Sequence, residues 1–581
     1  MNFELLANEL ILDIFEYLNS TQLLRAYHGL NIRLNNLLYL HFQNYSLDFR
    51  SVIKNDFNDI CQNILPLLTH QITSIHLSND DDTPNQPNLF LSFGFHFRQF
   101  SNLQSLSLHY IRSMELMNKI LSNCPQLISL NISKCTYDDD FEQSAICLNT
   151  IWSLKRLKSC YLDIESWNNL ENQVPIIISS SLQILSIEHE FITLNCLNSL
   201  FICTPNLHDL KINITDKLDN EELLSFNIPS LTKLKIYFES SLFSLKNLLK
   251  NLPNLSQLII QIDDIWIDGY QWKDIIRNYF NNLKIFQLLM FHRIHQDKII
   301  TEEIDYLIES FQTRFWLEQR QCFVRCDYHS EFGTTYLYTL PYGFCKFNRL
   351  ISNMSKSTCS IDKISTAFNY VNNLLLDYDL IEFASKFPIQ FLNIHSLDLA
   401  FPFNDVMWTV LPKFDRLTSL EIVSIAYSDE NYRPINHLQT VLDRSIHLYS
   451  LTIDYLILSE LSTVQINNKS IRRLDLISND GHYYGSECIS LIQSILGNQC
   501  EILLISIENR TIVLELIEKM SNLRALTFVC QTDQMDINNE SSSSSAAADD
   551  ELFQWMKHHL PSYCSISRDE NETAVVQLWI R

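Results

Sequence analysis

Glycine is scarce in this sequence of 581 residues, which contains only 8 of them. Such scarcity argues against a glycine-rich phosphate-binding loop and against a barrel built from many tight hairpins. The sequence also lacks any run of about 18 consecutive apolar residues, so it predicts no membrane-spanning helix. No cationic stretch opens the chain, which instead carries Glu4 and Asp13 near its start, so we expect no signal peptide.

Basic residues are few as well, with 43 Lys and Arg against 67 Asp and Glu and a net charge of -24. Nucleic acid and anionic membranes both require a positive field, so the charge balance disfavours them as partners. The 15 cysteines form an odd number at irregular spacing, and many lie in apolar segments, as Cys160, Cys326 and Cys530 do. This usage favours buried, reduced thiols and a cytoplasmic or nuclear location.

Apolar residues make up 46% of the chain, and many of them follow one recurring line, L-x-x-L-x-[LI]. Most neighbouring copies in the first block are 24 or 25 residues apart. The copies of the first block start at Ile72, Leu103, Leu127, Leu157, Leu182, Leu207, Leu231, Leu255 and Leu283, and those of the second block contain Leu397, Leu417, Leu451, Ile471, Ile502 and Leu523.

The line describes a short strand followed by a helix. Residues two apart in a strand point to the same face, and an amphipathic segment such as Met114–Leu121 supplies the helix. A proline two positions before the first Leu, as at Pro125 and Pro253, would end each helix and begin the next strand. One such unit cannot cover its own apolar face, but stacked neighbours can. The sequence therefore predicts an α/β solenoid, and the alternative is an ordinary α/β sheet protein.

The spacing and the line resemble leucine-rich repeats. The copy Leu127–Cys135 reads L-x-x-L-x-I-x-x-C, with Cys at the position where these repeats carry Asn or Cys. Its C-P-x-L junction is similar to the cysteine-containing subclass that is common in F-box proteins. The resemblance implies a leucine-rich-repeat horseshoe, with a first block over 71–291 and a second over 394–530.

The first 45 residues have another character. Glu9, Asp13 and Glu16 form one polar stripe on a helix that is otherwise apolar. Two further short helices are expected over Thr21–His28 and Ile32–Leu40, the former with Ser20 as its N-cap. Three short helices cannot bury all these faces on one another, and each exposed Leu or Ile leaves about 1.5–3 kcal/mol of burial unused. The excess apolar surface predicts a partner, which is either the repeat array or another protein.

This segment resembles an F-box. It runs L-A-N-E-L-I-L-D-I-F-E-Y-L from Leu6 to Leu18, followed by Q-L-L-R-A from Gln22, and it departs from the usual form at Ala7 and at Leu34 with Asn35. The resemblance implies docking onto a Skp-family adaptor and, through it, a cullin–RING ligase. The residues that it would place against the adaptor are Leu6, Glu9, Leu10, Ile14, Leu18, Leu23 and Leu24. The alternative is a helical cap on the solenoid.

The repeat line fades over residues 292–393, which we interpret as degenerate repeats or an insertion containing two strands that could pair. Cys322, Cys326 and His329 suggest a zinc site, but two cysteines four residues apart on a strand lie about 13 Å apart, too far to share one ion. His292 and His295 are expected at the surface. No metal ligand and no cofactor are predicted.

The remaining segments carry little chemistry. The acidic triplets 80–82 and 138–140 are interpreted as solvated loop residues, although calcium binding is the alternative. Residues 46–70 are expected to be a linker or first cap, 531–550 a disordered loop, and 551–581 a C-terminal cap with a helix over Leu552–Leu560 and a strand over Ala574–Ile580.

These expectations combine into a non-enzymatic substrate-recognition subunit of an SCF-type ubiquitin ligase, which binds the adaptor through residues 1–45 and a protein substrate through the repeats. The second hypothesis for the function is a leucine-rich-repeat scaffold or inhibitor with no ligase link. A third, an enzyme with its site in 292–393, has no residue pattern in its favour.

Overall fold

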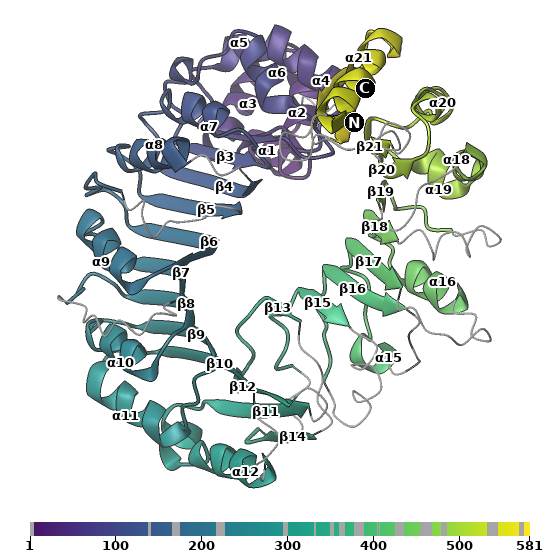
Figure 1. Cartoon of the computed structure of the whole chain (residues 1–581). Helices are drawn as coiled ribbons and strands as arrows, with labels where there is room; N and C mark the ends of the chain where they lie inside the picture. The colour runs from purple at the N-terminus through teal and green to yellow at the C-terminus, as the bar shows by residue number, and fades with distance from the viewer. Residues whose placement is uncertain are drawn as a thin grey trace. The chain divides into compact units, whose positions relative to one another are not determined.

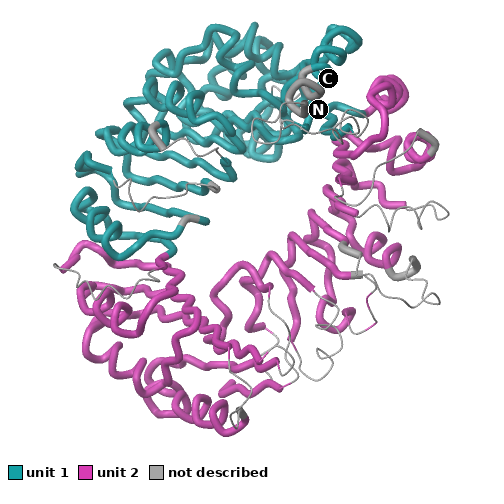
Figure 2. Tube along the Cα trace, in the orientation of Figure 1, with its two compact units in different colours: residues 1–213, 523–581 teal, residues 214–522 magenta. Residues whose placement is uncertain are grey.

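A computed structural model describes most of the chain. The described residues are 5–136, 141–165, 175–215, 227–293, 300–329, 333–348, 354–359, 366–376, 389–401, 403, 405, 407–424, 435–453, 467–477, 485–530, 544–568 and 574–581. They divide into two compact units, shown in Figure 2. Unit 1 contains residues 1–213 and 523–581, and unit 2 contains residues 214–522.

Unit 1 begins with three short helices, α1 (Asn8–Phe15), α2 (Ser20–Tyr27) and α3 (Ile32–Asn44). Asn19, and not Ser20 as predicted, is the N-cap of α2. Its side-chain oxygen accepts the backbone N–H of Gln22, and the Gln22 side-chain oxygen accepts the backbone N–H of Asn19. Ser20 instead exchanges hydrogen bonds with the backbone of Asp48, at 2.8 and 2.9 Å. The Ser20 hydroxyl thereby satisfies the backbone carbonyl and N–H of Asp48, at the outer edge of the strand that follows these helices.

A parallel sheet continues from this point through the first part of unit 1. Its strands, in spatial as well as sequence order, are β1 (Leu47–Asp48), β2 (Ser74–Ser78), β3 (Ser105–His109), β4 (Ser129–Thr136), β5 (Ser159–Glu165), β6 (Ile184–Ile192) and β7 (Asp209–Thr215). Figure 1 shows the connecting helices along one face of this sheet. They are α4 (Lys54–Asp59), η2 (Ile60–Ile64), α5 (Leu65–Leu68), α6 (Gln86–Ser92), η3 (Phe97–Gln99), α7 (Met114–Leu121), α8 (Phe141–Trp152) and α9 (Leu194–Cys203).

The repeat line sets the register of these strands. Leu106 pairs with Leu130 in the sheet, and Leu108 pairs with Ile132. All four side chains are buried, because the second and third positions of each copy point toward the helices. The prediction that one copy makes one strand and that stacked copies share a core is confirmed.

A ladder of side-chain amides joins successive repeats. The residue before the first Leu of a copy donates from its amide to a backbone carbonyl of the preceding copy. Asn206 donates to Ser180 at 2.7 Å, and Asn254 donates to Pro229 at 2.9 Å. The same bond occurs at Asn102, Gln126, Asn393 and Asn522. These amides satisfy loop carbonyls that the strands leave free.

Cys135, at the position where the resembling repeats carry Asn or Cys, joins two neighbouring repeats. Its sulfur accepts the backbone N–H of Ile111, one repeat earlier, at 3.2 Å, and both residues are buried. The residue before it, Lys134, adopts a left-handed backbone, as do Tyr110 and His189 at the equivalent positions of their copies. This shared turn directs the chain out of each strand toward its helix.

The C-terminal part of unit 1 is antiparallel. Strand β23 (Val575–Trp579) pairs with β21 (Ala525–Cys530) on one side and with β22 (Ser565–Arg568) on the other. The predicted final strand is confirmed. Helix α21 (Ser544–His559) starts within the segment predicted to be disordered, so that prediction is wrong for residues 544–550, and residues 531–543 lie outside the described part.

Unit 2 contains two parallel series separated by an antiparallel group. Strands β8 (Lys233–Glu239), β9 (Gln257–Asp263) and β10 (Ile285–Arg293) are parallel, and β12 (Thr334–Leu340), β11 (Phe323–His329) and β14 (Met354–Ser357) then continue the sheet antiparallel. The second series is β13 (Lys346–Phe347), β15 (Asn373–Leu376), β16 (Ser396–Phe401), β17 (Ser419–Ser424), β18 (Ser450–Ile453), β19 (Arg473–Leu476) and β20 (Ile502–Ile507). The helices of unit 2 are α10 (Leu242–Lys250), α11 (Gly269–Tyr279), α12 (Ile300–Ser310), η5 (Phe315–Gln319), α15 (Met407–Val410), α16 (Ile435–Arg444), α18 (Gly485–Gln493), α19 (Ile495–Gln499) and α20 (Thr511–Lys519).

The antiparallel group answers the question that the sequence left open about residues 292–393. The two expected strands, β11 and β12, do pair. Between them lies a buried polar network, in which Arg325 donates to Asp327 at 2.9 Å and the Tyr338 hydroxyl donates to the same carboxylate at 2.6 Å. A further copy of the line, Val371–Leu376, forms β15, so the second block starts before residue 394.

Among the described residues, no helix is both long and apolar enough to cross a membrane.

Candidate functional site

The three N-terminal helices pack around aromatic side chains. Phe15 is fully buried, with its ring 5.0 Å from Tyr27 and 5.8 Å from His41 between centroids. His41 also stacks on Tyr45 at 4.3 Å. Burial lowers the pKa of His41, although the nearby Glu16 carboxylate acts in the opposite direction. A neutral ring therefore fits this apolar interior.

The face of α2 that carries Leu23 and Leu24 is turned into unit 1. Both side chains are fully buried, and Arg25 on the same helix pairs with Asp56 of α4 at 2.5 Å. Leu23 and Leu24 were expected to contact an adaptor, and the structure corrects this expectation. Their side chains are enclosed by the chain itself, in which α2 lies against α3, β1, η2 and α4.

The other expected contact residues remain at the surface to different degrees. Glu9 and Leu10 on α1 are exposed, Leu10 to 50%. Leu6, Ile14 and Leu18 are half-buried. Five of the seven residues therefore offer at least part of their side chains to a partner.

Sequence reasoning missed several larger contributors to this surface. Tyr17, two residues after the end of α1, is 89% exposed, Leu5 is 83% exposed, and Ile32, at the start of α3, is 80% exposed. Arg33 fixes the two helices together, with Nε donating to Asn8 at 2.8 Å. An exposed tyrosine and isoleucine on a folded helix pair are the signal to search for, because buried positions cannot bind a partner without unfolding.

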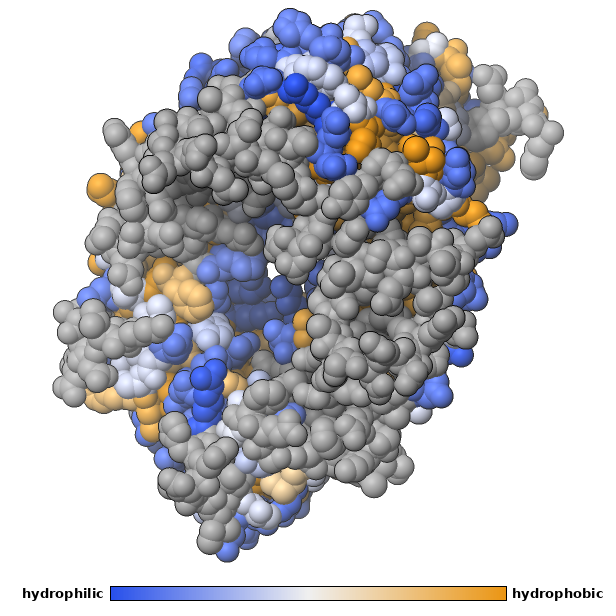
Figure 3. Space-filling model, turned by 45° about the vertical axis from the view of Figure 1, so that its right-hand side comes forward, coloured by the Kyte–Doolittle hydropathy of each residue, from blue (hydrophilic) through white to orange (hydrophobic). Residues whose placement is uncertain are grey.

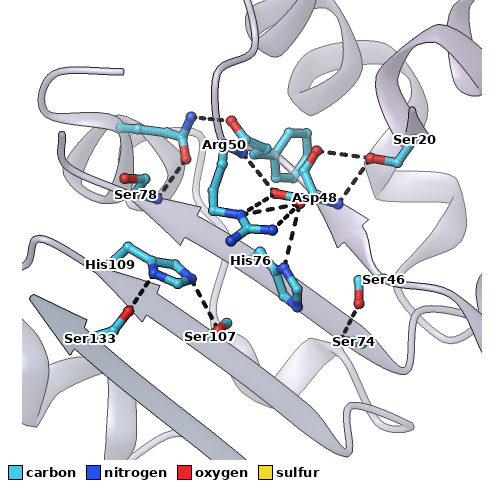
Figure 4. Close-up of polar contacts among 12 residues, drawn as sticks. Ser20, Ser46, Asp48, Arg50, Ser74, His76, Ser78, Ser107, His109 and Ser133 are labelled. Carbon is cyan, nitrogen blue, oxygen red and sulfur yellow. Dashed lines mark hydrogen bonds and ion pairs between the residues drawn. The ribbon is translucent and has the colours of Figure 1, made fainter. Parts of the chain in front are cut away.

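The sheet face without helices is a second candidate surface. Figure 4 shows its first strands, with Asp48 between Arg50 and His76. The Arg50 guanidinium lies 2.6 Å from the Asp48 carboxylate, and His76 Nδ1 lies 3.5 Å from it. Burial alone would raise the pKa of Asp48, but His76 and Arg50 hold it well below its usual range. This carboxylate is therefore charged and held in one orientation.

His109 occupies the next strand of this face. Its ring meets the hydroxyl of Ser107 at 3.1 Å on one side and the hydroxyl of Ser133 on the other. Burial lowers the pKa of His109 to about 4, and the positive charge of Arg50 acts in the same direction. The ring is neutral near pH 7 and presents hydrogen-bonding groups instead of charge.

Further along, the charges on this face are paired. Asp163 contacts His189 at 2.6 Å and accepts the backbone N–H of Lys134 at 3.2 Å. Glu188 pairs with Lys211 on the neighbouring strand. A polar face with fixed, paired charges can select a partner by matching its hydrogen bonds.

A serine recurs directly before the second apolar residue of the repeat line, and it lies on this face. Ser74, Ser105, Ser129 and Ser159 align across four strands, and Ser396, Ser419 and Ser450 align in unit 2. The sequence signal for these serines is the extended pattern L-x-S-L-x-[LI]. Small polar side chains keep this edge of the strands low and accessible.

In unit 2 the same face carries an acidic row. Asp398 and Glu421 are neighbours in the register, and Asp475 lies two strands beyond Glu421. Burial raises the pKa of Glu421, and the negative charges of Asp398 and Asp475 raise it further. This row is more negative than the strand face of unit 1.

On the side of the molecule drawn in Figure 3, hydrophobic residues are interspersed among hydrophilic ones.

The residues considered for metal binding lie apart from one another. Cys326 is buried in β11, Cys322 precedes the strand, and His329 ends it. Burial raises the pKa of Cys322 to about 12. His292 is half-exposed beside Trp266, and His295 lies outside the described residues. Within the described ranges no group of three or more His, Cys, Asp or Glu side chains could hold a metal ion.

The two acidic triplets have different outcomes. Residues 138–140 lie outside the described part of the chain. Asp82 is buried and Asp80 has its carboxylate enclosed by its own loop, so the interpretation of 80–82 as solvated acids is wrong. Hydrogen-bonding partners inside unit 1 account for these carboxylates.

No family model matches the chain, and no curated protein matches it by sequence. Among solved structures, the chain is similar to the LRR ectodomain of the plant membrane receptor kinase GASSHO1/SCHENGEN3 from Arabidopsis thaliana, in complex with CASPARIAN STRIP INTEGRITY FACTOR 2, at 12% identity and a TM-score of 0.22. That match covers 79% of this chain and 59% of the receptor chain, less than two thirds of its length.

The plant peptide hormone receptor RGFR1 in complex with RGF2 is similar at 11% identity and a TM-score of 0.19, over 75% of this chain and 67% of that one. TM-scores this low carry no argument about shape or ligand. The fold follows instead from the strands, register and amide ladder described above, which define an α/β solenoid of stacked repeats.

Proposed function

We propose that this chain is a non-catalytic substrate-recognition subunit of an SCF-type cullin–RING ubiquitin ligase. Residues 1–45 bind a Skp-family adaptor as an F-box, and the strand faces of the repeats bind a protein substrate. The observation that carries the proposal is the folded three-helix segment whose α1 and α3 keep large apolar side chains exposed. The motif from Leu6 to Ala26 supports the same assignment.

The action of such a subunit is proximity. A receptor that holds substrate and ligase together raises the effective concentration of one near the other, and it needs no reactive group of its own. Leucine-rich repeats suit this task because their open strand face is long and rigid. The paired charges from Asp48 to Lys211 would then set which substrate fits the unit 1 face.

A second function is favoured by one observation. The face of α2 that carries Leu23 and Leu24 is already buried inside unit 1, as a helical cap would require. In that case the chain is a protein-binding repeat scaffold or inhibitor without a ligase link. The two functions differ in whether the exposed surface of α1 and α3 binds an adaptor.

Affinity capture with tagged full-length chain and purified Skp-family adaptor separates them. Leu10→Asp combined with Tyr17→Asp adds two charges to the exposed surface, and we expect adaptor capture to fall at least tenfold. Leu67→Asp is the control, because Leu67 is exposed on α5 and belongs to none of the three N-terminal helices. Equal capture by both variants, with circular dichroism unchanged, or no capture by the unaltered chain, would leave the scaffold as the correct function.

A further inference from the structure

Two segments of unit 1 that lie far apart in the sequence contact each other directly. One is the start of the array, residues 47–86, and the other is residues 523–581. We propose that residues 523–581 form a releasable clasp, which closes on a latch made by the 80–82 loop together with Ser51 and Lys54. This proposal is independent of the function proposed above.

The 80–82 loop is shaped by its own hydrogen bonds. Asp80 Oδ1 accepts the backbone N–H groups of Asp82 and Thr83 at 3.1 and 3.0 Å, and the Thr83 hydroxyl at 2.9 Å. Gln86, fully buried at the end of the loop, donates to the Phe49 carbonyl at 2.8 Å. None of these contacts uses residues 523–581. The 80–82 loop is therefore preorganised when the clasp is open.

Asp81 points to the clasp instead. One oxygen of its carboxylate accepts both the Thr527 hydroxyl at 3.0 Å and the Gln577 amide at 3.1 Å. Thr527 and Gln577 are direct partners in the register of β21 and β23. Two neighbouring strands of the clasp thus converge on a single carboxylate, and both donors are buried. Asp81, the middle residue of the acidic triplet, therefore makes both hydrogen bonds only when β21 and β23 lie against the 80–82 loop.

Arg524 makes the second connection. Its guanidinium donates to the Ser51 carbonyl at 3.0 Å and lies 3.7 Å from the Asp82 carboxylate. The Ser51 hydroxyl donates to the same carboxylate at 2.9 Å. Asp82 and Arg524 are both almost fully buried, so the ion pair forms away from bulk water.

Lys54 makes the third connection from the latch side. Its ammonium donates to the backbone carbonyls of Tyr563 at 2.6 Å and Trp579 at 3.3 Å, which flank β22 and end β23. The Trp579 ring packs on Phe57 with centroids 5.4 Å apart. Burial lowers the pKa of Lys54, which marks how far this ammonium is removed from solvent.

The two segments are each held by hydrogen bonds of their own, and this independence is the reason to infer that they can separate. The contact between them is of mixed chemistry, because Trp579 and Phe57 are fully buried against each other and the backbone N–H of Lys54 donates to the Arg581 carbonyl at 2.7 Å. The groups at Asp81, Lys54 and Arg524 recover hydrogen bonds with water when the segments separate. Each side also keeps its own structure, the latch through Asp80 and the clasp through the pairing of β21, β23 and β22.

Hydrogen exchange measured by mass spectrometry on the full chain tests the proposal. Asp81→Ala removes the shared acceptor, and Lys54→Met removes the two carbonyl contacts while keeping an apolar stem. For each variant we expect the amides of β22 and β23 to exchange at least tenfold faster, with β3 and β4 unchanged. Asp59→Ala is the control, because Asp59 is exposed in the same unit and bonds Asn63 within its own helical segment.

Two results overturn the clasp. If β22 and β23 exchange in both variants as they do in the Asp59→Ala control, the contacts do not hold the segment. If β3 and β4 accelerate together with β22 and β23, or if the variants fail to fold, the segment belongs to one cooperative core and does not open separately.

Discussion

The Cys135 sulfur offers the sharpest test of how the repeats are held together. It is the acceptor for the buried N–H of Ile111, at 3.2 Å, across one repeat boundary. Cys135→Ala keeps the helix and strand propensities nearly unchanged but removes that acceptor. The Ile111 N–H then stays in an apolar surrounding without the partner that the native chain supplies.

The magnitude follows from the cost of an unsatisfied buried donor, about 1–3 kcal/mol, to which the small cavity left by the sulfur adds. We take about 2 kcal/mol for opening at this turn, and since about 1.4 kcal/mol is a factor of ten, exchange of the Ile111 amide should accelerate about 30-fold. Cys135→Asn should retain the protection, because an asparagine side chain offers a stronger acceptor at the position where leucine-rich repeats carry Asn or Cys.

The assay is native-state hydrogen exchange of the peptide that contains Ile111, at one pH and temperature for all variants. Cys147→Ala is the control, since Cys147 is fully buried on α8 near Cys135 and its truncation removes the same volume without removing the acceptor of the Ile111 N–H. Equal acceleration at Ile111 in the Cys147 variant would show that lost volume, and not the lost acceptor, loosens the turn. No acceleration in Cys135→Ala would refute the hydrogen-bond argument itself.

Two other predictions concern buried and paired charges. Asp327→Asn leaves Arg325 buried without its anion, so the urea midpoint of the unit 2 transition should fall, corresponding to about 3–5 kcal/mol; an unchanged midpoint would contradict the assigned network. The pKa of Asp48 is depressed, so its contribution is intact above the ordinary value of 3.8 and is lost as the pH falls below it. The melting temperature of the native chain should therefore fall more between pH 5 and pH 3 than that of the Asp48→Asn variant. Parallel plots of melting temperature against pH for the two proteins would disprove this role.

The repeats could be predicted from sequence because their signal is local. Each copy carries the alternation that a half-buried strand needs, and all the copies recognised in the sequence coincide with strands. The copy at Val371–Leu376 was missed because Val replaces the first Leu and the preceding interval is irregular. Strand β1, Leu47–Asp48, is too short to show any period and exists because it pairs with β2.

The acidic triplet 80–82 shows what composition cannot supply. Three consecutive aspartates in a loop have the sequence signature of a solvated turn. Their burial depends on Arg524, Thr527 and Gln577, which lie more than 440 positions away. No local pattern encodes a contact of that range, and only the fold brings these donors to the loop.

The N-terminal helices illustrate the same limit for binding residues. Their sequence shows more apolar surface than three helices can bury, but it does not say which neighbour covers each part. The structure assigns Leu23 and Leu24 to the chain's own interior, while Tyr17 and Ile32 remain exposed. Substituting either leucine would therefore disturb folding as well as binding. Tyr17 and Ile32 are the positions at which loss of a partner can be separated from loss of the fold, because their side chains do little for the core.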